Sequence, residues 1–390
     1  MCPQGASGGS SGLARRCGGG CTGGRMRAIG LTSMDRKPPS RLPRRLLLLL
    51  ALGLVALGAG HAVLWRGMAN GLEQGWQVWV QLRRAQGWRV EHTEPVRGGW
   101  PLSATLTIAR VRLEGGATTL PGGIALTATP VVLRVSLPWL DRLSVELPGQ
   151  QRLRLGAAEF PFAADMLTAT VPLEPDTPPS SAELRGERLR IGTPAGGVEV
   201  RSLMLTAAGS ASATETEPAL ALRLGAEGVE LPAGSGRGAE ALGRSIQSLA
   251  ADLWVSGPVP PGRAPAARAE SWRDGGGTLE LRSLALRWGE VAAQGAATLA
   301  FDDALQPMGA GTLRISGAVA ALETLAEAGV VGRRAATTAR TILPLLSRPS
   351  AETGVPEIEV PLTLEDRVLA LARIPVLRFA PLDWPSVGPR

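Results

Sequence analysis

The sequence predicts a mainly β protein, in which an N-terminal transmembrane helix precedes a large curved antiparallel sheet, or two meander-like sheets, with a few capping helices. Two observations lead to this fold class. One apolar segment near the N-terminus is long enough to cross a membrane, and short alternating strands separated by Gly, Pro and Asp fill most of the remaining chain. Because no long amphipathic helix interrupts these strands, an antiparallel meander is favoured over parallel strand-helix-strand units.

The positive charge of the chain lies in residues 1–45, which hold nine basic side chains and one acidic one. The remaining 345 residues carry 32 basic and 33 acidic groups, so the body is nearly neutral and we expect no nucleic-acid partner. Residues 1–45 lack a hydrophobic period and predict a disordered leader, within which Met34 offers a later translation start. All three cysteines, Cys2, Cys17 and Cys21, precede the apolar segment, so the body forms no disulfide.

The apolar segment, residues 46–65, reads LLLLLALGLVALGAGHAVLW and carries no formal charge. A helix of about twenty such residues spans the hydrocarbon core of a bilayer. Arg41, Arg44 and Arg45 precede it, and the positive-inside tendency then keeps the N-terminus cytoplasmic and sends the body into the periplasm. We therefore predict a single-pass anchor in the inner membrane. A cleaved signal peptide is the alternative, because Gly60-His61-Ala62 offers small residues to a peptidase.

Helical spacing continues through residues 66–86, where Leu72, Trp76 and Trp79 recur on one stripe. This predicts an amphipathic helix that follows the span directly. The stripe suits either an aromatic belt at the membrane interface or packing against the sheet, and packing against a sheet is the commoner arrangement.

A first β-rich region is predicted over residues 87–255. The apolar residues of 102–108 share one parity and Val111 and Leu113 take the other, which indicates a bulge or a strong twist between them. Charged and apolar residues alternate in many strands, as in Arg152-Leu153-Arg154-Leu155, so one face of the sheet is wet. The other face must be hidden by a second sheet, by curling of the sheet, or by a bound apolar ligand. Further short strands are predicted at 124–128, 131–137, 143–147 and 153–155.

A Pro- and Gly-rich stretch, residues 256–277, predicts a loop or linker, and a second β-rich region with short helices is predicted over 278–390. Helical composition at 319–328 and 333–346 predicts two helices that cap the sheet. The strongest hairpin pattern is Ile358 to Leu371, with a turn at Glu365-Asp366-Arg367.

The inventory of chemically reactive side chains is poor. The chain has no tyrosine, the body has no cysteine, and its only imidazole after the apolar segment is His92. The adjacent carboxylates Asp302 and Asp303 fall where a hairpin turns, a place that Asp favours for local hydrogen bonds. His61 ends the apolar segment without an acidic partner there. We therefore expect no enzyme, no cofactor, and no catalytic, cofactor-binding or metal-binding residues.

Several short motifs of glycine, tryptophan and leucine stand out in the body. They are Gly87-Trp88-Arg89-Val90, Gly98-Gly99-Trp100-Pro101-Leu102, Leu286-Arg287-Trp288-Gly289 with Gly295 and the Leu299 to Leu313 hairpin, Val360-Pro361-Leu362, and Leu382-Asp383-Trp384-Pro385. Together they resemble a bacterial family known as domain of unknown function 2125. The resemblance implies a membrane-anchored, periplasm-facing β-rich protein and brings no catalytic residues. The layout is also similar at the level of the fold to AsmA-like envelope proteins.

These observations lead to two functional hypotheses. The first is an envelope lipid-binding or assembly factor whose curved sheet shields a lipid acyl chain or docks an envelope protein beside the membrane. The second is a structural or scaffolding protein that acts through protein contacts and holds no small-molecule ligand.

Overall fold

The computed structural model of the chain describes residues 44–115, 123–173, 180–210, 213, 218–257, 259, 265–349 and 354–384. The chain divides into two compact units, Met1–Ala56 and Leu57–Arg390. The predicted leader up to residue 43, with Cys2, Cys17, Cys21 and Met34, lies outside the described residues. The second unit contains the sheet and the larger, C-terminal part of the first helix.

Helix α1 (Arg44–Ala85) runs without a break through the predicted span and the predicted amphipathic segment. It is the one described helix that is long and apolar enough, by length and composition, to cross a membrane. None of its most apolar stretch is buried, whereas the core helix of a soluble protein would be mostly buried. In the second unit, the helix buries Ala69, Leu72, Trp76 and Val80, which are spaced to share one face.

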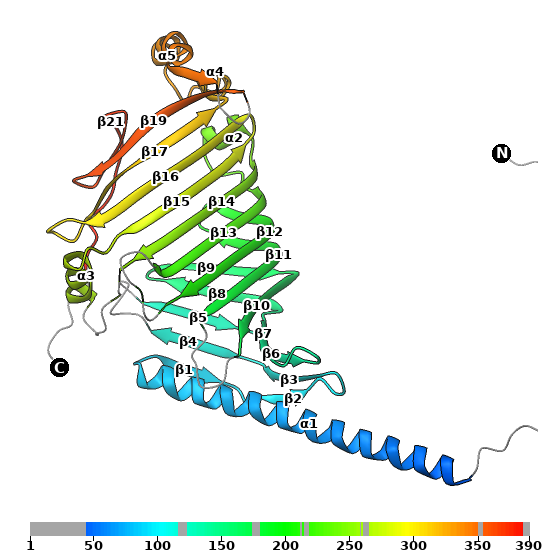
Figure 1. Cartoon of the computed structure of the whole chain (residues 1–390). Helices are drawn as coiled ribbons and strands as arrows, with labels where there is room; N and C mark the ends of the chain where they lie inside the picture. The colour runs from blue at the N-terminus through cyan, green and yellow to red at the C-terminus, as the bar shows by residue number, and fades with distance from the viewer. Residues whose placement is uncertain are drawn as a thin grey trace, which may run out of the picture. The chain divides into compact units, whose positions relative to one another are not determined.

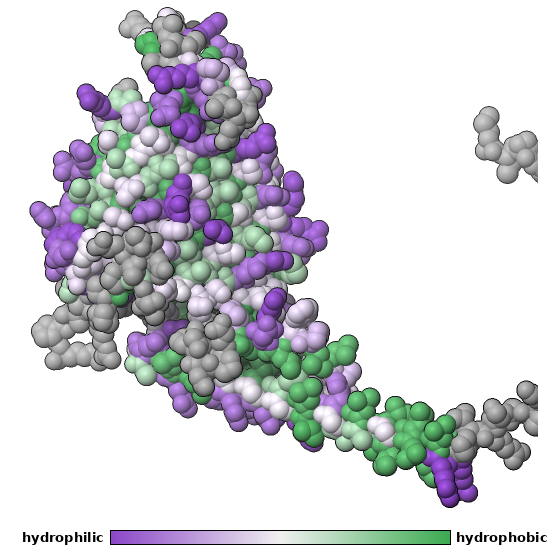
Figure 2. Space-filling view, viewed as in Figure 1, coloured by the Kyte–Doolittle hydropathy of each residue, from purple (hydrophilic) through white to green (hydrophobic). Residues whose placement is uncertain are grey.

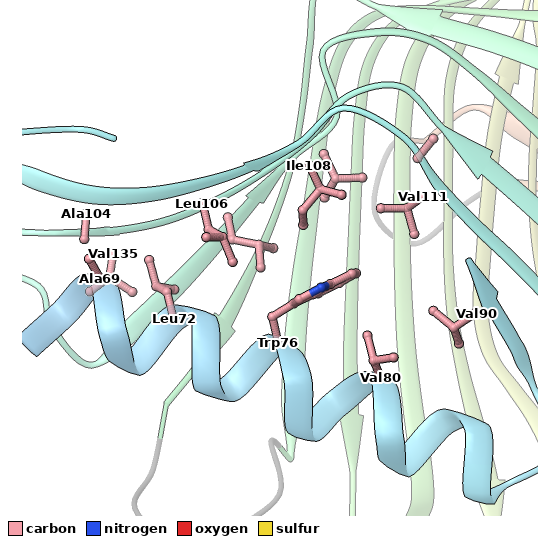
Figure 3. Packing of buried hydrophobic residues seen from close by; sticks show 13 residues of the cluster. Ala69, Leu72, Trp76, Val80, Val90, Ala104, Leu106, Ile108, Val111 and Val135 are labelled. Carbon is pink, nitrogen blue, oxygen red and sulfur yellow. The ribbon is translucent and has the colours of Figure 1, made fainter. Parts of the chain in front are cut away.

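The buried face of α1 packs against the nearest strands of the sheet. Leu106 and Ile108 are 1% and 0% exposed and lie opposite Leu72 and Trp76, and Figure 3 shows the Trp76 indole reaching from the helix toward them. The cluster also includes Val80. Of the two arrangements that the tryptophan stripe left open, packing against the sheet is therefore correct for Trp76.

The N-terminal half of the sheet is a meander of five strands, each broken near its middle, so that one half lies in each of two branches. The first branch has the strand order β2 (Val96–Gly98), β3 (Ser103–Ile108), β6 (Val131–Ser136), β7 (Arg142–Glu146) and β10 (Met166–Pro172). The second branch has the strand order β1 (Arg89–His92), β4 (Val111–Gly115), β5 (Ile124–Ala128), β8 (Gly149–Leu155) and β9 (Ala158–Ala164). All pairings are antiparallel, and α1 packs against residues of both branches.

The chain crosses between the branches along a line that we call the crease, formed by residues 93–95, 109–110, 129–130, 147–148 and 165. Backbone groups at a broken strand lose their ladder partners and need others. Gln151 supplies them at one crossing: its Oε1 accepts from Thr129 N at 2.8 Å and its Nε2 donates to Pro148 O at 2.9 Å. The parity switch after residue 108 is the crossing at 109–110.

Both branches join at β11 (Ser181–Thr193). Its N-terminal half pairs with β10 and its C-terminal half pairs with β9. Long antiparallel strands then follow in chain order, as Figure 1 shows. They are β12 (Gly196–Gly209), β13 (Pro218–Glu230), β14 (Ser245–Ser256), β15 (Leu279–Trp288), β16 (Val291–Phe301), β17 (Pro307–Ser316), β19 (Pro356–Glu365), β20 (Val368–Leu371) and β21 (Ile374–Arg378), with the short β18 (Ser347–Pro349) beside β19.

Four short helices accompany the long strands. Helices α2 (Arg237–Leu242), α4 (Ala318–Glu327) and α5 (Arg333–Leu346) gather at one end of these strands, and α3 (Pro265–Asp274) lies at the other end (Figure 1). The fold class is thus the predicted one, realised as one continuous antiparallel sheet rather than two. The predicted loop or linker, residues 256–277, contains α3, and the strands on either side of it, β14 and β15, are paired neighbours.

Candidate functional site

The long strands carry one face made only of apolar residues, which we call the leucine face. Residues that are paired across antiparallel strands point to the same side of the sheet. The register aligns them in four rows that run across seven or more strands. The rows are Leu184, Leu205, Leu224, Ala251, Leu284, Gly295, Leu313, Val360; Gly186, Leu203, Ala226, Leu249, Leu286, Ala293, Ile315, Ile358; Ala182, Ala207, Leu222, Leu253, Leu281, Ala297, Gly311, Leu362, Leu371; and Gly209, Leu220, Val255, Leu279, Leu299, Gly309, Leu364, Leu369.

Every leucine of this face is half-buried, in contrast to the nearly inaccessible Leu106 and Ile108 beneath α1. Where the face meets the crease, Leu203 and Leu249 pack against Leu189 and Val200 in a second core cluster. The described strands all belong to a single sheet, so no second described sheet packs on the leucine face. Each leucine of this face therefore keeps part of its side chain accessible to an occupant.

The opposite face of the same strands mixes charged and small side chains with a few large apolar ones, among them Met204, Trp254 and Met308. One row on it reads Arg185, Met204, Gly225, Ala250, Ala285, Gln294, Arg314 and Glu359. Arg314 Nε lies 3.0 Å from Glu359 Oε2 across the strands, an ordinary exposed ion pair. In Figure 2 the strongly hydrophilic residues gather along the margins of the sheet in the view drawn. The wet and dry faces predicted from the alternation of charge and leucine are both present.

A hollow of about 620 Å³ lies on the polar side of the second branch. Small residues of β5 form its floor, and Arg110, Arg112, Arg152 and Arg154 rise from the strands on either side. Three of these arginines are already paired: Arg112 and Arg154 with Glu114, at 3.5 and 3.1 Å, and Arg152 with Glu159 at 3.3 Å. The hollow is therefore largely neutralised from within, and it favours an anion less than its arginine count indicates.

The ionisable residues that the sequence brings to attention, His61, His92 and Asp302, make contacts that stabilise the fold locally. His61 Nε2 lies 2.8 Å from Pro101 O, and the His92 ring packs edge-on against Trp76 at 5.3 Å. Asp302 Oδ1 accepts from the backbone N–H groups of Ala304 and Gln306 within the β16–β17 turn. Among the described residues, no group of three or more His, Cys, Asp or Glu side chains is placed to hold a metal ion.

Two arginines have a shifted pKa. The hydrogen bond that Arg134 donates to Glu146, at 2.7 Å, raises the pKa of Arg134, and the hydrogen bond to Asp274 raises the pKa of Arg273. Both shifts favour the charged form that arginine already has at neutral pH. Neither shift produces an acid or base suited to catalysis near neutral pH.

The tryptophans of the sequence motifs join distant segments. Trp288 Nε1 donates to Gly243 O at 2.6 Å, and Trp384 Nε1 donates to Leu305 O at 3.0 Å. Trp88 lies against Gly115, where an added Cβ would fall 2.5 Å from the indole ring. These contacts give the motifs a role in folding. The leucine face was not identified from the sequence, because its rows depend on the register of strands far apart in the chain.

A family model described as an uncharacterized protein conserved in bacteria, domain of unknown function 2125, matches residues 65–380. Searches of curated proteins and of solved structures found no match. The matched segment includes every described strand of the sheet, from β1 to β21. Because the model covers well over half of the chain, the protein belongs to this bacterial family, as its glycine and tryptophan motifs indicate.

Proposed function

We propose that this protein is a non-catalytic lipid-binding factor of the bacterial envelope, anchored in the inner membrane by α1 with its body in the periplasm. The observation that carries the proposal is the leucine face, four charge-free rows whose leucines are only half-buried. Each methylene group removed from water contributes roughly 0.8 kcal/mol. A lipid acyl chain along the rows would bury its own surface and that of the leucines together.

Helix α1 and the residues before it support this location. The helix is long and apolar enough to span a bilayer, and Arg41, Arg44 and Arg45 precede the apolar segment. The positive-inside tendency favours a cytoplasmic N-terminus for such a segment. A body that emerges beside the bilayer has direct access to lipids, which makes an acyl chain a more fitting occupant of the leucine face than a soluble apolar metabolite.

Photo-crosslinking of the full chain in its native membrane tests the proposal. The photoreactive residue p-benzoylphenylalanine replaces Leu224 on the leucine face or, as the matched control, Met204 on the polar face. We expect lipid adducts by mass spectrometry from position 224 and few from position 204. Equal labelling of the two positions, or no lipid adduct at 224, would reject lipid binding at this face.

A second candidate is a scaffolding protein without a small-molecule ligand. The observation that favours it is the open edge of the sheet at β21, which pairs with β20 and with no other described strand. An unpaired edge is a template for a strand from another chain. A third variant with the photoreactive residue in place of the exposed Leu377 of β21 separates the two functions, because a scaffold would give protein adducts at position 377 and no lipid adducts at position 224.

A further inference from the structure

Two turns at one end of the first branch hold large apolar side chains in solvent. The β2–β3 turn, residues 99–102, carries Trp100 and Leu102, which are 54% and 70% exposed. The β6–β7 turn, residues 137–141, carries Trp139 and Leu140, which are 62% and 42% exposed. Exposed large apolar residues are ordinary when scattered, but a cluster of them marks an interaction surface.

The two turns lie side by side. Leu137 N donates to Leu102 O at 3.0 Å, and Ser103 pairs with Ser136 in the adjoining ladder of β3 and β6. The four exposed side chains therefore occur on neighbouring turns rather than at separate places on the surface. We call these four residues, Trp100, Leu102, Trp139 and Leu140, the apolar turns.

The β2–β3 turn is fastened to α1 at the C-terminal end of the apolar segment. His61 Nε2 lies 2.8 Å from Pro101 O, and Trp65 Nε1 donates to Ser103 O at 2.8 Å. The Trp100 ring meets both side chains edge-on, at 4.9 Å from His61 and 5.7 Å from Trp65. These contacts fix the turn beside the last helical turn of residues 46–65.

We propose that the apolar turns insert into the interface of the bilayer that α1 spans, so that the body contacts the membrane at two points besides its anchor. This inference rests on the anchored location given above. A helix rises 1.5 Å per residue, so twenty apolar residues use up about 30 Å of hydrocarbon and residues 61–65 reach the headgroup zone. Tryptophan is the side chain that favours this zone, and Trp65, Trp100 and Trp139 would reach it together.

Two arginines lie near the apolar turns. The Arg142 guanidinium lies 5.5 Å from the centre of the Trp139 ring and forms an exposed ion pair with Asp141 at 3.8 Å, which is weak in water and leaves Arg142 able to meet a headgroup. Arg66 follows Trp65 on α1, is exposed, and forms no ion pair with the residues that the structure describes. Such cations beside apolar residues are typical of membrane-surface contacts. A bilayer is therefore a better occupant than a second protein, which would need a larger continuous patch.

Site-specific fluorescence in vesicles tests this proposal on the full chain. Cys2, Cys17 and Cys21 are the only cysteines, so replacing all three with serine allows single labelling sites at Leu102→Cys, Leu140→Cys and, as the exposed control, Met204→Cys. Each variant carries an environment-sensitive dye and is reconstituted into vesicles of phosphatidylcholine and phosphatidylglycerol. Aqueous iodide and brominated lipid then serve as the two quenchers.

We expect labels at 102 and 140 to be quenched by brominated lipid and to be about threefold less accessible to iodide than the label at 204. If the protein stays with the vesicles after a carbonate wash while all three labels respond alike, the apolar turns do not contact the bilayer and the anchor still stands. Release of the protein by the wash would overturn both the anchor and this inference. Acyl-chain binding at Leu224 is measured separately and its failure leaves these outcomes unchanged.

Discussion

Asp165 Oδ1 accepts a 2.9 Å hydrogen bond from Arg190 Nη2 at the point where the sheet divides into its two branches. The other carboxylate oxygen forms an ion pair with Arg188, which takes a left-handed backbone conformation (φ 48°) between the halves of β11 that pair with β10 and β9. The Asp165 carboxylate thus binds β11 at the point where the pairing partner of this strand changes from β10 to β9.

Replacing Asp165 with alanine should lower the free energy of unfolding by about 1 kcal/mol, because exposed pairs are individually weak but two cations here lose their shared partner. Urea titration of the full chain in detergent measures this. The control is Glu159→Ala, which removes an exposed pair with Arg152 away from the division. A loss no larger than that of the control would contradict a special role for Asp165.

Trp76→Ala should lower the free energy of unfolding by about 3 to 5 kcal/mol, since the ring packs between α1 and both branches and its removal leaves a cavity. The matched control is Val78→Ala on the same helix, whose side chain is 64% exposed. The denaturation midpoint of each variant, and its rate of proteolytic cleavage in the chain that follows β1, measure the difference between the two substitutions. Equal effects of the two substitutions would mean that α1 does not stabilise the sheet.

Gln151→Ala should destabilise the protein by about 1 to 3 kcal/mol, because it leaves the Thr129 N–H and the Pro148 carbonyl without their partner at the crease. Gln151 is 1% exposed, so water does not replace the amide easily. The exposed neighbour Gln150 provides the control substitution. Chemical denaturation that ranks Gln150→Ala as the more damaging change would count against the crease as a stabilised feature.

Arg367→Gly should raise stability, by up to about 1 kcal/mol, since Asp366 and Arg367 both have positive φ (49° and 64°) in the closing hairpin turn. A two-residue turn with both residues in this region favours Asn-Gly or Asp-Gly. Thermal unfolding of the variant measures the gain. A lower midpoint than that of the native chain would show that the Arg367 side chain contributes more than its backbone costs.

The sequence predicted elements whose signals are local. The apolar segment predicted α1, the alternation in Ile358–Leu371 predicted β19 and β20, and the parity switch after residue 108 marked a real discontinuity. The cause of that switch was not predictable, because the crossing between branches depends on β11 pairing with both β9 and β10. Pairing of this kind is set by contacts far apart in sequence.

The segment predicted as a loop or linker, residues 256–277, shows what composition does not predict. Its Pro and Gly content correctly indicates a break in strand structure, but α3 forms there and Trp272 Nε1 donates to Ser256 O at 3.0 Å. That hydrogen bond joins the helix to the end of β14, so the segment connects two paired strands. Composition alone did not distinguish such a connection from a domain boundary.

The measurement that tests lipid binding most directly compares the amount of lipid that co-purifies with two variants, which carry substitutions at adjacent residues of β15. Leu284 lies on the leucine face and Ala285 on the polar face. Leu284→Arg places a charge where an acyl chain would lie, whereas Ala285→Arg places it in solvent. Mass spectrometry of lipid extracted from equal amounts of each folded, purified chain should show loss with Leu284→Arg and native levels with Ala285→Arg. Equal lipid in both variants, or none in the native chain, would contradict the proposed function.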